Sequence, residues 1–133
     1  MIIADTSAWI EFLRRTGHPV GVRLRELIVQ RAELGVTEVI VMELLAGARR
    51  GNLARDLRSR LLTYPVMPLA RLADFEEAAA IYRMCRDAGH SIRTISDCLI
   101  AVPVLREGAS LLHNDKDFDV IARLTGMKIA PTA

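Results

Sequence analysis

Aromatic residues are scarce in this sequence: three Phe, two Tyr and one Trp make up 5% of the 133 residues, whereas hydrophobic residues make up 51%. The interior must therefore be built from Leu, Ile, Val and Ala, a mixture that suits helices packed on a sheet. Only two cysteines occur, Cys85 and Cys98, without a CxxC motif or paired histidines. This disfavours a disulfide framework or a zinc site, and we expect two buried free thiols.

Long apolar runs are also missing. No stretch of about 18 uninterrupted apolar residues occurs, so no transmembrane helix is expected. At the N-terminus, Asp5 interrupts the apolar run before a signal peptide could form. We therefore expect a soluble, cytoplasmic protein with no membrane partner. The length lies near the commonest domain size, which predicts a single domain over residues 1–133.

Lysine is rare as well, because only Lys116 and Lys128 of the 18 cationic residues are lysines. A formal net charge of +2 is too small to indicate nucleic-acid binding by itself. The planar fork of arginine pairs with phosphate through two hydrogen bonds. A GC-rich genome would produce the same bias toward arginine, so both interpretations stay open.

Short apolar runs alternate with segments of helical periodicity along the chain. The predicted strands are 1–4, 34–36, 110–113 and 127–130, with 66–67 an edge strand at best between two prolines. The predicted helices are 6–13, 20–33, 37–47, 51–63, 74–89, 97–107 and 115–124. Thr37, Ser96 and a capping box of Asp74 and Glu77 are the expected helix starts. Strands separated by helices predict an α/β fold, a three-layer α/β/α sandwich with a mostly parallel central sheet.

Four acids occupy suggestive positions relative to these elements. Asp5 follows the first strand and Asp115 the fourth, so both should face the crevice at the carboxyl ends of the strands. Asp97 opens a helix, where the positive N-terminus favours its ionised form, although ordinary capping would also explain it. Glu43 lies on a helix that is apolar around nearly its whole circumference, which indicates burial. A Glu at an exposed seam is the alternative.

Carboxylates that converge without matching cations repel one another, and a divalent cation relieves that repulsion. Mg²⁺ prefers oxygen ligands and keeps several waters. Such a centre can activate water for attack on a phosphodiester. The constellation of acids therefore indicates a metal-dependent hydrolase.

Four motifs in order, IIADTSAWIEFL, VIVMELLAGAR, SDCLIA and LLHNDKDFDVIA, resemble the PIN-domain ribonuclease toxins of VapBC type over nearly the whole chain. The resemblance implies a PIN-like sandwich and an endoribonuclease that uses Mg²⁺ or Mn²⁺ and is the toxin of a type II toxin–antitoxin system. It also implies an RNA substrate, an antitoxin that binds in a groove and places an Arg among the acids, and a homodimer.

The same resemblance implies the catalytic acids Asp5, Glu43, Asp97 and Asp115, with Asp117 as an adjacent alternative, and a metal held by Asp5, Asp97 and Asp115. Thr6 and Ser7 would line the site. The family pattern often has Thr where this chain has His113, which puts one supporting hydrogen bond in doubt. The arginines near the acid-bearing segments would grip the RNA backbone. They are Arg14, Arg15, Arg49 and Arg50.

Other functions place acids similarly. A phosphoacceptor domain would have two neighbouring acids after the first strand, and a dehalogenase-like phosphatase would have a second Asp two residues after Asp5, where Ser7 stands. A non-catalytic PIN-like module that binds RNA or protein is the stronger alternative. Intact acids disfavour it.

Overall fold

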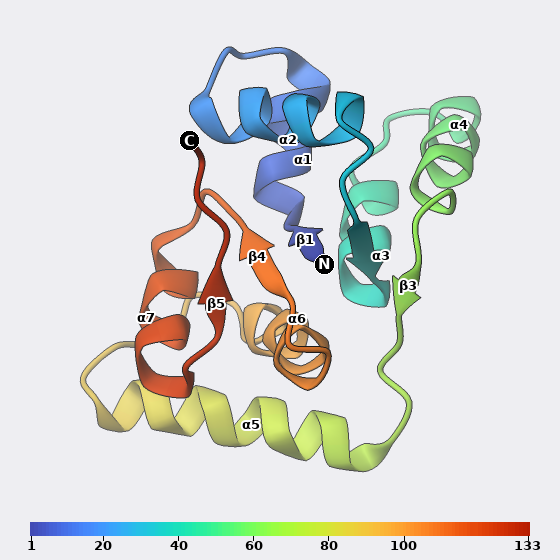
Figure 1. Ribbon diagram of the computed structural model, residues 1–133. Coiled ribbons are helices and arrows are strands. Elements are labelled where there is room, and N and C mark those ends of the chain that lie inside the picture. The colour runs from blue at the N-terminus through green and yellow to red at the C-terminus, as the bar shows by residue number, and fades with distance from the viewer.

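The computed structural model describes all residues from 1 to 133 and contains five strands and seven helices (Figure 1). The strands are β1 (Ile2–Ala4), β2 (Leu34–Thr37), β3 (Val66–Met67), β4 (Ser110–Leu112) and β5 (Lys128–Ile129). The helices are α1 (Thr6–Arg14), α2 (Pro19–Val29), α3 (Glu38–Ala46), α4 (Gly51–Leu61), α5 (Leu72–Asp87), α6 (Ile95–Arg106) and α7 (Lys116–Thr125). Every element predicted from the sequence is present.

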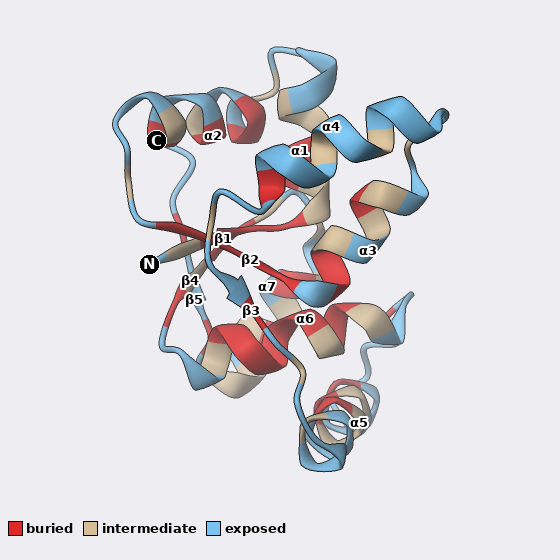
Figure 2. Ribbon diagram, turned by 90° about the vertical axis from the view of Figure 1, so that its right-hand side faces the viewer, coloured by how far each residue is buried: buried red, intermediate tan, exposed pale blue.

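The five strands form one parallel sheet in the order β3-β2-β1-β4-β5. The chain builds outward from β1 to β3, then crosses back and adds β4 and β5 on the other side of β1. In Figure 2 the helices α1, α2 and α4 lie above the sheet, and α5, α6 and α7 lie below it. The predicted three-layer sandwich is confirmed. The crossovers on the two sides of β1 differ in direction, so the ends of β1 and β4 border a switch point where ligands commonly bind.

The core is almost entirely aliphatic, as the composition predicts. Thirty hydrophobic residues are buried in one cluster, most of them Ile, Leu, Val and Ala. Trp9 is the largest buried side chain and packs its ring against Phe12 and Tyr64. Cys85 and Cys98 are buried and free, and burial raises the pKa of both thiols. They therefore remain protonated and serve as core residues.

Two helix starts differ from prediction. Helix α5 begins at Leu72, and the Asp74 carboxylate accepts a hydrogen bond from the Ala70 backbone N–H at 3.0 Å. Asp74 therefore reaches back over the helix start instead of preceding it. Helix α6 begins at Ile95, so Ser96 lies inside its first turn. No helix is long and apolar enough to cross a membrane.

Candidate metal centre

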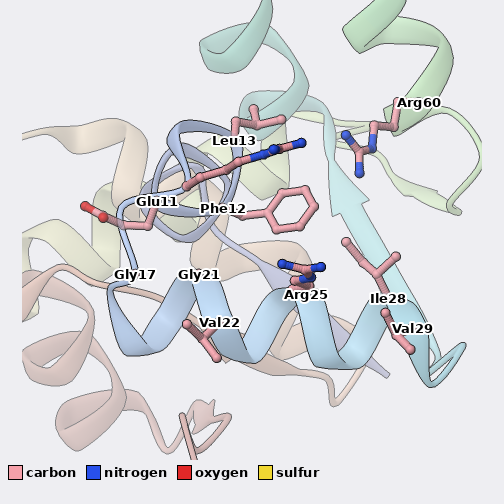
Figure 3. Close-up of a pocket in the computed structure, with 11 residues that line it drawn as sticks. Glu11, Phe12, Leu13, Gly17, Gly21, Val22, Arg25, Ile28, Val29 and Arg60 are labelled. Atoms are coloured by element: carbon pink, nitrogen blue, oxygen red, sulfur yellow. The ribbon is translucent and has the colours of Figure 1, made fainter.

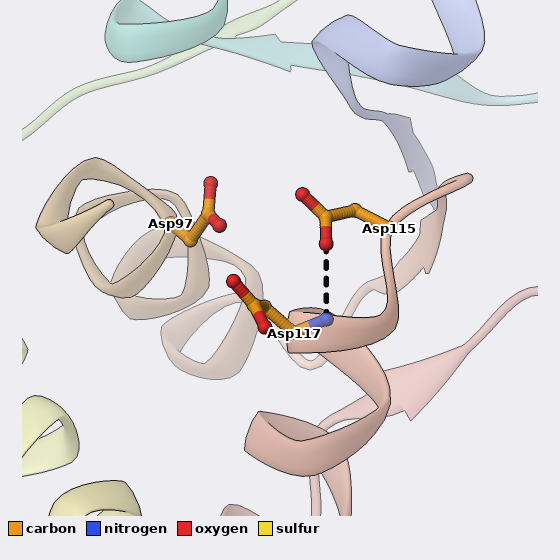
Figure 4. A group of neighbouring side chains, drawn as sticks. All are labelled: Asp97, Asp115 and Asp117. Atoms are coloured by element: carbon orange, nitrogen blue, oxygen red, sulfur yellow. Dashed lines mark hydrogen bonds between the residues drawn. The ribbon is translucent and has the colours of Figure 1, made fainter. Parts of the chain in front are cut away.

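Three aspartates converge next to the end of β4. Asp97 comes from the first turn of α6, whereas Asp115 caps α7 and Asp117 lies in its first turn (Figure 4). One carboxylate oxygen from each lies within 4.8 Å of the other two. The Asp115 carboxylate accepts a hydrogen bond from the Asp117 backbone N–H at 3.0 Å, which fixes both residues on one helical turn. All three carboxylates thus sit at the positive N-terminal ends of helices.

His113 supplies the supporting hydrogen bond that the sequence put in doubt. Its Nδ1 accepts from the Asp115 backbone N–H at 3.0 Å, and its Nε2 lies 3.2 Å from the Asp119 carboxylate. The ring also packs against Phe118, and its side chain is only 6% exposed. The imidazole therefore orients the Asp115 segment, as a threonine hydroxyl acceptor would do.

Asp5 lies beside this trio but outside it. The residue is 4% exposed, and its carboxylate accepts hydrogen bonds from the Ser7 backbone N–H at 3.0 Å and from the Ser7 hydroxyl at 2.6 Å. The Ser7 hydroxyl in turn accepts from the Asn114 backbone N–H at 2.9 Å, which joins α1 to the segment that carries Asp115. Asp5 is thus the N-cap of α1. The compact trio is Asp97, Asp115 and Asp117, which differs from the predicted ligand set of Asp5, Asp97 and Asp115.

Glu43 joins α3 to α1. Its Oε1 accepts a hydrogen bond from the Thr6 hydroxyl at 2.7 Å. The helix is less buried than its sequence indicates, because Met42 is 59% exposed and Glu43 is only half-buried. The prediction of a fully buried α3 was therefore wrong: apolar residues also occur on surfaces, so an apolar circumference does not prove burial. Glu43 is consequently reachable by solvent.

The acids share one electrostatic environment. The pKa of Asp97 is raised to about 7, mainly by burial and in addition by the negative charges of Asp115, Asp5, Asp117 and Glu43. Burial also raises the pKa of Asp5 against the opposing Ser7 hydrogen bonds, and it raises the pKa of Glu43. Although only three acids form the compact trio, the charges of all four other predicted acids act on Asp97, and the charge of Asp5 also acts on Glu43.

The PIN domain family model matches residues 2–124, nearly the whole chain. The VapC ribonuclease of Mycobacterium bovis and ribonuclease VapC11 of Mycobacterium tuberculosis are each 43% identical to this chain, over 98% of both sequences. The chain belongs to the VapC family of PIN domains. The resemblance carried by the four sequence motifs is thereby confirmed.

Solved structures share the fold of this PIN domain at low sequence identity. A VapBC2 complex from Rickettsia felis, bound to a promoter DNA fragment, gives a TM-score of 0.73 at 17% identity and covers 98% of each chain. FitAcB from Neisseria gonorrhoeae gives 0.71 at 19% identity and covers 99% of this chain and 98% of that chain. These likenesses establish the three-layer architecture.

One residue of this PIN domain that contacts the acids was not predicted from sequence. Arg93 precedes α6 in the connection from α5, and its Nη2 lies 3.1 Å from the Asp115 carboxylate. Its Nε lies 3.6 Å from the Asp117 carboxylate, which also accepts a hydrogen bond from the Arg93 backbone N–H at 3.0 Å. The contacts span 22 and 24 residues, and no local motif marks them.

Two hollows of the surface bear on the site. One, of about 710 Å³, adjoins the trio and is lined by Asp115, Asp117, Arg93 and Lys116 among others. The other, of about 520 Å³, lies between α1 and α2 and contains none of the five acids (Figure 3). Arg15 lines this second hollow. The predicted RNA-gripping arginines Arg14, Arg15, Arg49 and Arg50 are all exposed.

Proposed function

We propose that this PIN domain is a Mg²⁺- or Mn²⁺-dependent endoribonuclease of the cytoplasm and the toxin of a type II toxin–antitoxin system. The main support for this proposal is the convergence of Asp97, Asp115 and Asp117 in a chain of the VapC family. Ribonuclease activity is named for the mycobacterial relatives. The intact cluster disfavours the alternative of a non-catalytic binding module.

The donor set suits a hard divalent cation. The trio offers carboxylate oxygens alone, and neither free cysteine belongs to it. Mg²⁺ and Mn²⁺ prefer such oxygen ligands, whereas zinc sites favour thiolate and imidazole. Asp97, Asp115 and Asp117 would hold the ion, and Asp5 would add negative charge from the α1 N-cap. When bound, the ion supplies an activated water and a countercharge for the phosphodiester.

The other residues act around that centre. Glu43 is half-buried with a raised pKa, which suits it to accept a proton from water, and the Thr6 hydroxyl fixes one of its oxygens. Ser7 holds Asp5 in place. Exposed arginines at the ends of α1 and α3 would bind the RNA backbone. They are Arg14, Arg15, Arg49 and Arg50.

The hollow between α1 and α2 would receive the antitoxin. Leu13, Val22 and Val29 are exposed there, and Val29 is 74% exposed. Arg25 and Arg60 point into the hollow in Figure 3. This mixture of apolar surface and positive charge fits an amphipathic, acidic segment. A similar structure from Klebsiella pneumoniae is a toxin–antitoxin complex, and we further expect this chain to form a homodimer.

Induced expression followed by sequencing of new RNA 5′ ends tests the proposal. We expect recurrent cleavage sites with the wild-type chain and none with Asp97→Asn. Purified protein should cut the same RNA with Mg²⁺ or Mn²⁺ and stop in EDTA. RNA binding without cleavage under any of these metals would establish the binding-module alternative instead.

A further inference from the structure

A single cationic side chain contacts the trio of Asp97, Asp115 and Asp117. The ion pairs of Asp115 and Asp117 are both made by Arg93, and no ion pair involves Asp97. Arg93 nevertheless remains 75% exposed. Exposed ion pairs contribute little to stability, so a competing ligand can replace this one at small cost.

The guanidinium has one occupied edge and one free edge. Nε and Nη2 face the two carboxylates, whereas Nη1 makes no hydrogen bond. Arg93 also lines the 710 Å³ hollow that adjoins the trio, together with Asn114 and Lys116. Arg93 therefore borders the same open space through which a phosphodiester would reach the carboxylates of Asp115 and Asp117.

We propose that Arg93 is a phosphate-binding residue of the nuclease that rests on Asp115 and Asp117 until substrate arrives. The planar fork that fits a carboxylate also fits a phosphate, so the guanidinium can exchange one partner for the other. This inference rests on the proposed ribonuclease function and adds a residue to it.

The exchange predicts two effects of opposite sign. Arg93 occupies carboxylates that would hold the cation, and its positive charge repels that cation. Removing Arg93 should therefore strengthen the binding of metal to the protein in the absence of RNA. The same change removes a phosphate ligand and should weaken RNA binding. An arginine that merely orients the carboxylates would give the reverse effect on metal affinity, since loss of a supporting residue commonly weakens metal binding.

The metal arm titrates Mn²⁺ into purified protein without RNA and follows free Mn²⁺ by electron paramagnetic resonance. Arg93→Gln should bind Mn²⁺ about tenfold more tightly than wild type, the scale of one water-screened unit charge close to a divalent ion. Arg93→Lys keeps the charge and should stay nearer to wild type. Lys116→Gln is the matched control, because the Lys116 side chain lines the same hollow whereas the ion pairs to Asp115 and Asp117 come from Arg93, and it should change the affinity less.

The RNA arm measures fluorescence anisotropy of a short 2′-O-methyl oligonucleotide of mixed sequence in Ca²⁺. Arg93→Gln should weaken binding about tenfold, within the range for loss of a charged phosphate contact, and more than Lys116→Gln does. Thermal melts check that all variants fold. Weaker or unchanged Mn²⁺ binding by Arg93→Gln would overturn the proposal, as would unchanged oligonucleotide binding. Failure of the ribonuclease proposal itself would show separately, as wild-type protein that cleaves no RNA.

Discussion

Glu43 is the acid with the clearest opportunity to handle a proton, because one oxygen is fixed by Thr6 and the side chain stays half-exposed. Replacement by Gln keeps the shape but removes the charge. We expect RNA cleavage by Glu43→Gln to fall by about 10² or more, the range for a lost acid–base or electrostatic group. Glu77→Gln, an exposed change of the same type on α5, should retain wild-type turnover. Full activity in Glu43→Gln would return Glu43 to a purely structural role.

Asp97 should make metal-free stability depend on pH. Its pKa is raised from 3.8 to about 7, so the folded state holds a proton that the unfolded state has released between those values. The free energy of unfolding should therefore fall as pH rises through this window. Melts in EDTA at about pH 5 and about pH 8 measure the difference. Asp97→Asn should reduce it, and an undiminished pH dependence in this variant would assign the effect to other groups.

The sequence predicts the acids but not their grouping. The positions of Asp5, Asp97 and Asp115 beside predicted strands and helices single them out, whereas the compact trio is Asp97, Asp115 and Asp117. Asp5 lies outside the compact trio, and its carboxylate instead accepts a hydrogen bond from the Ser7 hydroxyl at the start of α1. Arg93 reaches Asp115 only through tertiary folding, so no periodicity indicates it.

Helices α1 and α2 pack unusually closely at Gly21. A Cβ added there would lie 2.9 Å from two backbone atoms, the carbonyl carbon of Glu11 and the amide nitrogen of Phe12. Backbone cannot move aside as a side chain can, so Gly21→Ala should destabilise the protein by about 1–3 kcal/mol, as overpacking does. Urea denaturation measures this.

Gly47→Ala is the matched control for that change. A Cβ at Gly47 would meet only ordinary contacts at 3.6 Å, and its φ of −78° suits alanine. Its stability should equal that of wild type or exceed it slightly, because alanine restricts the unfolded chain. Equal stabilities of the two variants would show that the helices can separate at Gly21.

Element type was predictable from sequence because apolar runs and helical periodicity are local signals. Helix starts were less predictable from sequence than element type. Thr37 does cap α3, because its hydroxyl accepts a hydrogen bond from the Ile40 N–H at 3.3 Å. Helices α5 and α6, however, begin without a side-chain cap. A capping motif therefore does not mark where these two helices begin. The partial exposure of α3 is likewise a feature that the local sequence does not show.

For the whole molecule, metal should act as a stabilising ligand. Wild type should gain about 2.7 kcal/mol at a hundredfold excess of Mg²⁺ or Mn²⁺ over the dissociation constant. Thermal melts with EDTA and with metal measure the gain. Asp97→Asn should lose most of it, and Asp5→Asn less, since Asp5 lies outside the trio. Asp5→Asn should also match or exceed wild-type stability in EDTA, because it keeps an acceptor for Ser7 and removes a repelling charge.

Equal metal-induced shifts in wild type and Asp97→Asn would show that the ion binds elsewhere. A large loss of stability by Asp5→Asn in EDTA would contradict this expectation. It would show that the negative charge of Asp5 stabilises the α1 N-cap by more than its repulsion of Asp97 destabilises the protein.

Expression without a partner should arrest growth of the host cell. The reason is the intact cluster of acids in a chain of the VapC family. Growth curves after induction measure this, with Asp97→Asn as the inactive control at matched protein levels. Normal growth with abundant folded wild-type protein would count against the toxin assignment.

The acidic centre and the hollow between α1 and α2 become complete at different times while the chain is synthesised. The acidic centre needs Asp117, so no nascent chain that ends before this residue can assemble it. The hollow between α1 and α2 draws on nothing beyond Arg60, in the first half of the sequence. During translation the surface proposed for the antitoxin therefore leaves the ribosome well before the last acid does. An antitoxin already present in the cell can meet a chain that is not yet able to cut RNA.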